Sequence, residues 1–227
     1  MSDAMRSFGL NARWELRRLS RSQRGWLLLI PPVAGPLGSA IADLYLHIPS
    51  LATAQILGLL IAGGLSGLIV LDLAGLAAGE DLALRAHVTF FALPQDRRAI
   101  LAGRLFVVLG GGLAAYAVAA VGVWYGSAAL VAPDASVRAI FPPAHLALAV
   151  PAFLLFLAGV TVAGAVYTRT SAQGLVAGVL AGVVVAGATG ALLADGELTL
   201  LFPLVLALAG AGALGWALVQ YPNLGGA

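Results

Sequence analysis

The residues that could do chemistry in this 227-residue chain are few and far apart in sequence. The histidines are His47, His87 and His145, and no pair of them has the spacing of metal ligands. The chain has no cysteine, which excludes disulfides, thiolate catalysis and cysteine–metal sites. It also lacks a Gly-x-Ser-x-Gly nucleophile motif and a phosphate-binding P-loop. We therefore expect no catalytic residue, no metal site and no cofactor bound by this chain, and no nucleotide hydrolysis by it alone.

Two acidic residues, Asp43 and Asp72, lie close to long apolar segments of the sequence. Each is compatible with two interpretations. It can sit at a membrane interface, where a charge costs little, or it can line a substrate or ion pathway. The last three apolar segments contain no charged residue, which disfavours a proton-coupled carrier.

The elements that carry these residues must lie in lipid. Hydrophobic residues make up 61% of the chain and charged residues 10%, whereas a soluble domain is about half apolar and about a quarter charged. Six apolar segments are long enough to cross a bilayer. We predict an all-α polytopic membrane protein with spans at about residues 26–46, 53–74, 100–125, 143–167, 171–193 and 198–219.

The basic residues, all arginines, predict the orientation of these spans. If the N-terminus is cytoplasmic, eleven of the twelve arginines face the cytoplasm and only Arg138 faces outwards. We therefore expect a multi-pass protein of the plasma membrane with both termini in the cytoplasm. Arg104, near the start of the third span, is expected to extend towards the lipid headgroups.

Residues 1–25 have the pattern of an amphipathic helix lying in the membrane interface, ahead of a spanning domain at 26–220 and a short tail at 221–227. A disordered basic tail is the alternative for this segment. Trp14, Arg17 and Arg18 belong to the predicted interfacial helix. Its expected apolar face consists of Met5, Phe8, Ala12, Leu16 and Leu19. Its expected basic face consists of Arg6, Arg13, Arg17, Arg21 and Arg24.

Prolines and glycines predict how the spans bend and pack. Pro31, Pro32 and Pro36 fall inside the first span, so we expect it to be kinked or broken. Small residues at four-residue spacing allow close helix contacts, either within the chain or across a homodimer. The clearest such ridge is Gly174, Gly178 and Gly182 on the fifth span. Similar ridges are Gly63 and Gly67 on the second span, and Ala207, Ala211 and Gly215 on the sixth.

The segment between the second and third spans, residues 79–99, is the most charged part of the chain after the N-terminus. It contains the acids Glu80 and Asp81, then Leu93-Pro94-Gln95-Asp96-Arg97-Arg98, followed by Ile100-Leu101-Ala102-Gly103-Arg104. This order, together with the basic N-terminal helix and six spans, resembles a type-2 ATP-binding-cassette (ABC) permease, the membrane subunit of an exporter. Two features differ from that family. Leu82-Ala83-Leu84-Arg85 stands where it often has Gly-Thr, and Arg104 replaces its usual lysine.

The resemblance implies a coupling helix at about residues 81–93 that docks on a separate ATPase. Helix dipoles favour Glu80 and Asp81 at its start, and Pro94 would end it. The contact residues would be Glu80, Asp81, Arg85, Phe90, Phe91, Pro94, Arg97 and Arg98. An ordinary solvated loop is the alternative for this segment.

The partners implied by the resemblance are two copies of that ATPase, a second permease chain (identical or related) and the lipid bilayer, but no nucleic acid. ATP and magnesium would bind to the ATPase, and the exported substrate would be apolar or amphipathic. Three other functions remain open: a non-transporting scaffold or assembly subunit, an intramembrane enzyme or haem-export-type component, and a gated channel.

Overall fold

The computed structural model describes residues 3–44, 51–83, 96–131, 144–194 and 200–225. Every regular element within these residues is an α-helix or a 3-10 helix. Six helical segments are long and apolar enough to cross a membrane, which confirms the predicted all-α, six-span fold. They are Gln23–Ala42, Ala54–Gly79, Arg97–Tyr125, Leu148–Thr168, Ser171–Thr189 and Leu201–Asn223.

The N-terminal part forms one long helix and then a broken first span. Helix α1 covers Asp3–Arg21 and is followed by the short helix α2, Gln23–Trp26. A 3-10 turn, η1 (Leu27–Leu29), then leads into α3, Ile30–Leu44. The predicted break is confirmed. It falls just before Pro31 and Pro32, which carry no backbone N–H to donate to a carbonyl four residues earlier. The Leu27 carbonyl accepts a hydrogen bond from the Ile30 nitrogen instead, as in a 3-10 turn.

The remaining spans are α4 (Leu51–Ala83), α6 (Arg97–Val131), α7 (Ala144–Thr168), α8 (Ser171–Ala194) and α9 (Leu201–Gln220). A final 3-10 helix, η3, covers Tyr221–Gly225. Helices α4 and α6 have 33 and 35 residues, well above the roughly 20 that a bilayer requires. Both helices therefore extend past the apolar layer.

The expected helix start at Glu80 and Asp81 is wrong. Helix α4 continues through both acids and ends at Ala83, so they lie in its last turn. The second span had been expected to end near Ala74, but the helical apolar segment extends to Gly79. The rest of the predicted coupling helix, including Arg85, Phe90, Phe91 and Pro94, lies outside the described residues.

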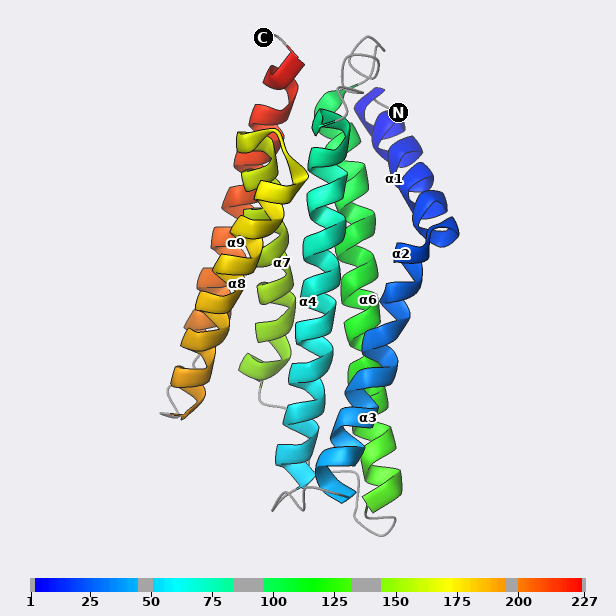
Figure 1. The fold of residues 1–227 in the computed structure, drawn as a ribbon, viewed down its shortest axis with the longest axis vertical. Coiled ribbons are helices and arrows are strands. Elements are labelled where there is room, and N and C mark those ends of the chain that lie inside the picture. Colours follow the sequence, from blue (N-terminus) through cyan, green and yellow to red (C-terminus); the bar gives the residue numbers. More distant parts are fainter. Residues whose placement is uncertain (1–2, 45–50, 84–95, 132–143, 195–199, 226–227) are drawn as a thin grey trace.

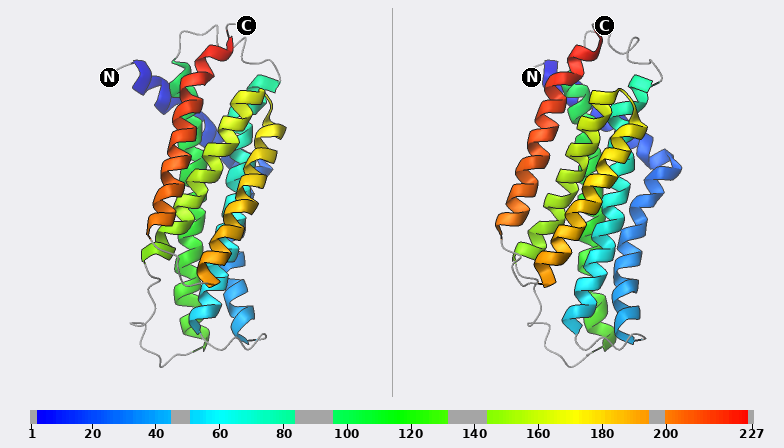
Figure 2. Two further views of the ribbon diagram at one scale, coloured as in Figure 1. Left: turned by 90° about the vertical axis from the view of Figure 1, so that its left-hand side faces the viewer. Right: turned by 60° about the vertical axis from the view of Figure 1, so that its left-hand side comes forward.

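Helices α3, α4 and α6 pack against one another, α7 packs against α4, and α8 and α9 flank α7 (Figures 1 and 2). Both chain ends, the end of α4, the start of α6 and the α7–α8 turn lie at one end of the bundle. Every arginine in the described part of the chain belongs to elements at this end, which we call the arginine end. The clustering agrees with the positive-charge asymmetry that orients membrane proteins.

The glycine ridge of α8 packs within the chain. A Cβ at Gly174 would lie 2.6 Å from the Thr161 carbonyl oxygen of α7, and one at Gly182 would lie 3.0 Å from Leu157 Cδ2. A Cβ at Gly178 would collide with the side chains of Thr161 and Leu71. The small residues therefore set the spacing between α8 and α7, as close helix packing in lipid requires.

The small-residue ridge predicted on α4 makes a helix contact, whereas the one predicted on α9 does not. Gly63 and Gly67 face Val150 and Leu157 of α7 at 3.1 and 3.0 Å, measured from a built Cβ. On α9 the predicted ridge is on the wrong face, because Gly215 has no neighbour within 4 Å and Ala211 is exposed. Gly210 makes the contact instead, with a built Cβ 2.7 Å from the backbone of Leu155 and Phe156.

Candidate functional site

The candidate site is the junction at the arginine end where α1 packs across α6. Gly103 of α6 makes this close contact possible, because a Cβ there would lie 2.7 Å from the Phe8 carbonyl oxygen and 3.1 Å from the Ala12 nitrogen. Next to it, the rings of Phe8 and Phe106 meet edge to face with centroids 5.6 Å apart. Helix α1 is thus part of the bundle's packing.

The face of α1 that packs on the bundle is more polar than predicted. Leu19 is 5% exposed, but Met5 and Leu16 of the expected apolar face are 66% and 60% exposed. The buried face also includes Ser7 and Glu15. The predicted stripe is therefore divided. One edge contacts α6, and Met5 and Leu16 are left in a position to face lipid, where an interfacial helix places apolar side chains.

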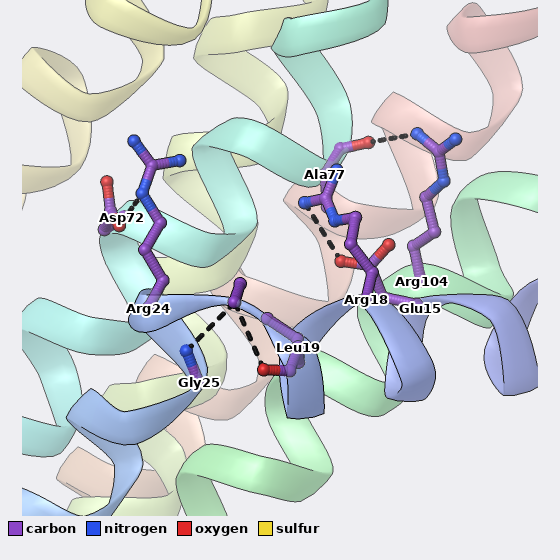
Figure 3. A network of polar contacts seen from close by, with 9 residues as sticks. Glu15, Arg18, Leu19, Arg24, Gly25, Asp72, Ala77 and Arg104 are labelled. Carbon is purple, nitrogen blue, oxygen red and sulfur yellow. Dashed lines mark hydrogen bonds and ion pairs between the residues drawn. The ribbon is translucent and has the colours of Figure 1, made fainter.

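Arg104 lies at the centre of this junction, and the expectation that it reaches the headgroups is wrong. The residue is only 2% exposed, and its Nη1 donates a hydrogen bond to the Ala77 carbonyl of α4 at 3.3 Å. Its guanidinium also stacks over the Trp14 ring of α1, 5.2 Å from the centroid. One side chain of α6 therefore contacts both α1 and α4. Figure 3 shows the contact with Ala77 of α4.

Glu15 supplies the negative charge in the same cluster. It is fully buried, and its Oε1 pairs with Nη2 of Arg18 at 3.1 Å, one helical turn further along α1. Arg18 also stacks over Trp14, with its guanidinium carbon 5.6 Å from the ring centroid. Buried charges cost folding free energy unless they are paired. The Glu15–Arg18 pair, drawn in Figure 3, meets that requirement for Glu15.

Asp72 forms an ion pair with Arg24 at the same end of the molecule. Its Oδ2 lies 3.7 Å from Nε of Arg24, and the two side chains are 38% and 52% exposed. Asp43 lies in the last turn of α3, at the opposite end. The two aspartates are thus far apart along the bundle, and Asp72 fits the interface interpretation.

Other predicted contact residues have partners within the chain. Arg97 donates from Nη1 to the Pro222 carbonyl oxygen at 2.7 Å, which ties the start of α6 to η3. The backbone nitrogen of Arg98 donates to Asp96 Oδ1 at 2.9 Å, so Asp96 caps α6, while the Arg98 side chain is exposed. Arg17 is exposed on α1.

An apolar cavity of about 280 Å³ lies towards the opposite end of the bundle, between α4, α6, α7, α8 and α9. Tyr116 and Thr189 supply its hydroxyl groups, and none of its lining residues in the described part of the chain is charged. The lining consists of Ile56, Leu59, Leu60, Gly63, Gly64, Tyr116, Ala149, Val150, Phe153, Ala186, Thr189, Phe202 and Leu206. Small-molecule sites have this mainly apolar character with a few polar groups.

The sequence interpretation missed the roles of Glu15, Gly103 and Arg104. Two signals were available: a glutamate three residues before an arginine on a helix, and a glycine immediately before an arginine inside a span. In comparisons with known proteins, no family model, no curated protein and no solved structure matches the chain.

Proposed function

We propose that this chain is the membrane subunit of an ABC-type exporter, powered by a separately encoded ATPase. The observation that carries the proposal is the junction of α1, α4 and α6 around Arg104. It joins a basic interfacial helix to the two spans that flank segment 79–99. A push applied to that segment would act on α4, α6 and α1 together, because Arg104 of α6 contacts both α4 and α1.

The position of the long helices supports this mechanical role. Helix α4 extends past its apolar segment at the arginine end, where α6 begins, and the arginine bias assigns this end to the cytoplasm. A partner that hydrolyses ATP must bind on that side. Domain movements of transporters are transmitted by such rigid elements, which rock around the central path.

The apolar cavity supports the substrate class. Its wall of aliphatic and aromatic side chains, with hydroxyls from Tyr116 and Thr189, suits an apolar or amphipathic molecule with few hydrogen-bonding groups. The cavity lies in the half of the bundle away from the arginine end. It would receive substrate on the way to the outer leaflet.

The test is co-purification and reconstitution. The chain, solubilised from its native membrane, should bring down an ABC ATPase whose hydrolysis rises when both are placed in proteoliposomes. The double variant Phe90→Ala, Phe91→Ala should lose this stimulation, and Tyr125→Ala, an exposed aromatic site towards the other end of α6, serves as the control. Recovery of the chain without any ATPase, together with unchanged activity of the double variant, would contradict the proposal and favour a scaffold.

A further inference from the structure

A polar pocket of about 350 Å³ lies where the chain bends from α1 into the first span. It is lined by Arg18, Leu19, Ser22, Gln23 and Arg24 from the bend, and by Leu73 from α4. This pocket is separate from the apolar cavity and from the contact between Arg104 and Ala77.

The bend is held in shape by local contacts. Ser22 Oγ accepts a hydrogen bond from the Gly25 nitrogen at 3.1 Å, and the Ser22 nitrogen donates to the Leu19 carbonyl, also at 3.1 Å. A Cβ at Gly25 would collide with that same carbonyl, so only glycine fits there. The pocket wall is therefore preformed, which lowers the entropy cost of binding a ligand.

The charge around the pocket favours an anion. Two of its six lining residues, Arg18 and Arg24, are arginines, and none of the six is acidic. The Arg24–Asp72 pair is long, at 3.7 Å, and both side chains are substantially exposed. Exposed ion pairs of this kind contribute little to folding stability. Arg24 can therefore exchange the Asp72 carboxylate for an anion that offers more oxygen atoms.

The depth of the pocket identifies the source of that anion. The first apolar segment begins at Gln23, and Leu73 lies six residues inside the end of the α4 segment at Gly79. Six residues of helix correspond to about 9 Å, the level at which headgroups meet acyl chains. Leu19 and Leu73, at 5% and 1% exposed, belong to the buried core and close the pocket on that side.

We propose that this pocket binds the phosphate of an anionic phospholipid. Arg24 and Arg18, which already pairs with Glu15, supply the donors for the phosphate oxygens, and the depth of the pocket places them at the level of the lipid headgroup. Guanidinium groups suit this role because their planar donors match phosphate geometry. The inference does not depend on the transporter proposal, since it uses only the bend and its position in the membrane.

The experiment titrates the purified full-length chain, in nonionic detergent, with phosphatidylglycerol or phosphatidylcholine and counts bound lipids by native mass spectrometry. Phosphatidylglycerol should bind more tightly. Arg24→Gln should weaken its binding roughly five-fold, as expected for one interfacial arginine. Arg13→Gln, which removes the same charge from an exposed site outside the pocket, should leave binding of this lipid unchanged. Asp72→Asn should strengthen it, because the competing carboxylate is lost.

Equal weakening by Arg24→Gln and Arg13→Gln would overturn the site in favour of diffuse attraction to a basic surface. Displacement of phosphatidylglycerol by millimolar inorganic phosphate would overturn the lipid assignment. If Arg24→Gln does not fold, as judged by its thermal transition, Asp72→Asn decides the matter. If Asp72→Asn binds phosphatidylglycerol as tightly as the unaltered chain, or more weakly, the proposal is overturned.

Discussion

Arg104 illustrates how one side chain can connect three helices at one end of a membrane bundle. An unpaired arginine inside a span costs several kcal/mol, yet Arg104 is 2% exposed. The cost is offset by the Ala77 carbonyl and by the Trp14 ring. These partners come from α4 and α1, so the charge of α6 is tolerated only when all three helices are in place.

Replacing Arg104 should therefore destabilise the folded chain. We expect Arg104→Gln to lower the free energy of unfolding by about 2 kcal/mol, because a charged hydrogen bond is lost inside the protein. Thermal or denaturant unfolding in detergent measures this change. Arg98→Gln is the matched control, since the Arg98 side chain is exposed on the same helix, and it should have little effect. Equal stabilities of the two variants would show that the Arg104 contacts do not contribute.

At the scale of elements, several helix contacts in the described part of this chain are set by glycines whose missing Cβ lets a neighbouring helix approach closely. Gly103 lets α1 lie on α6, Gly178 lets α8 lie on α7 and α4, and Gly210 lets α9 lie on α7. Apolar burial provides little attraction between helices in lipid, so such contacts and their hydrogen bonds hold the bundle together.

The α1–α6 contact should be lost when Gly103 is given a side chain. The Cβ of Gly103→Ala would press on backbone atoms of Phe8 and Ala12, which move only if α1 moves. We expect a loss of about 1–3 kcal/mol in unfolding free energy, typical of overpacking. Gly110→Ala on the same helix, where nothing lies within 4 Å, should instead be neutral or stabilising by helix propensity. The prediction fails if both variants melt at the same temperature.

The α8 contact provides an independent test of the same principle. Gly178→Ala should destabilise the chain, because the new methyl would collide with Thr161 and Leu71. Gly187→Ala, on the same helix but with open space around it, should not. Comparing the midpoints of their detergent unfolding curves separates packing from helix propensity. A stable Gly178→Ala variant would mean that α8 does not pack on α7 as described.

For the whole molecule, the described arginines gather at one end of the bundle, and both termini lie there too. This asymmetry predicts that the arginine end faces the cytoplasm. It also places α1, the end of α4 and the start of α6 on the side where a soluble partner would bind.

The orientation can be measured directly, because the natural chain has no cysteine that would react in the background. Gly9→Cys in α1 and Asn223→Cys in η3, both at exposed positions, should react with a membrane-impermeant maleimide only after the cells are opened. Leu200→Cys, at the start of α9, should react in intact cells. Labelling of Gly9→Cys in intact cells would reverse the proposed orientation.

The sequence by itself determined the six spans, the break near Pro31 and the glycine ridge on α8. These features depend on local composition, on the geometry of proline and on the helical period, all of which act over a few residues. The amphipathic pattern also predicted a helix before the first span, and α1 occupies that position. The coupling contacts at Phe90 and Phe91 stay a prediction.

Only the tertiary structure decided where Arg104 and Glu15 lie and which side of α1 faces the bundle. The environment of a charge depends on neighbours distant in sequence, and Ala77, Trp14 and Arg104 come from three different helices. The sequence could not distinguish a headgroup-reaching arginine from a buried one, because both occur near the start of a span. For the same reason Gly210, rather than Gly215, makes the α9 contact: the helical period gives the possible faces, but the neighbouring helix α7 selects one.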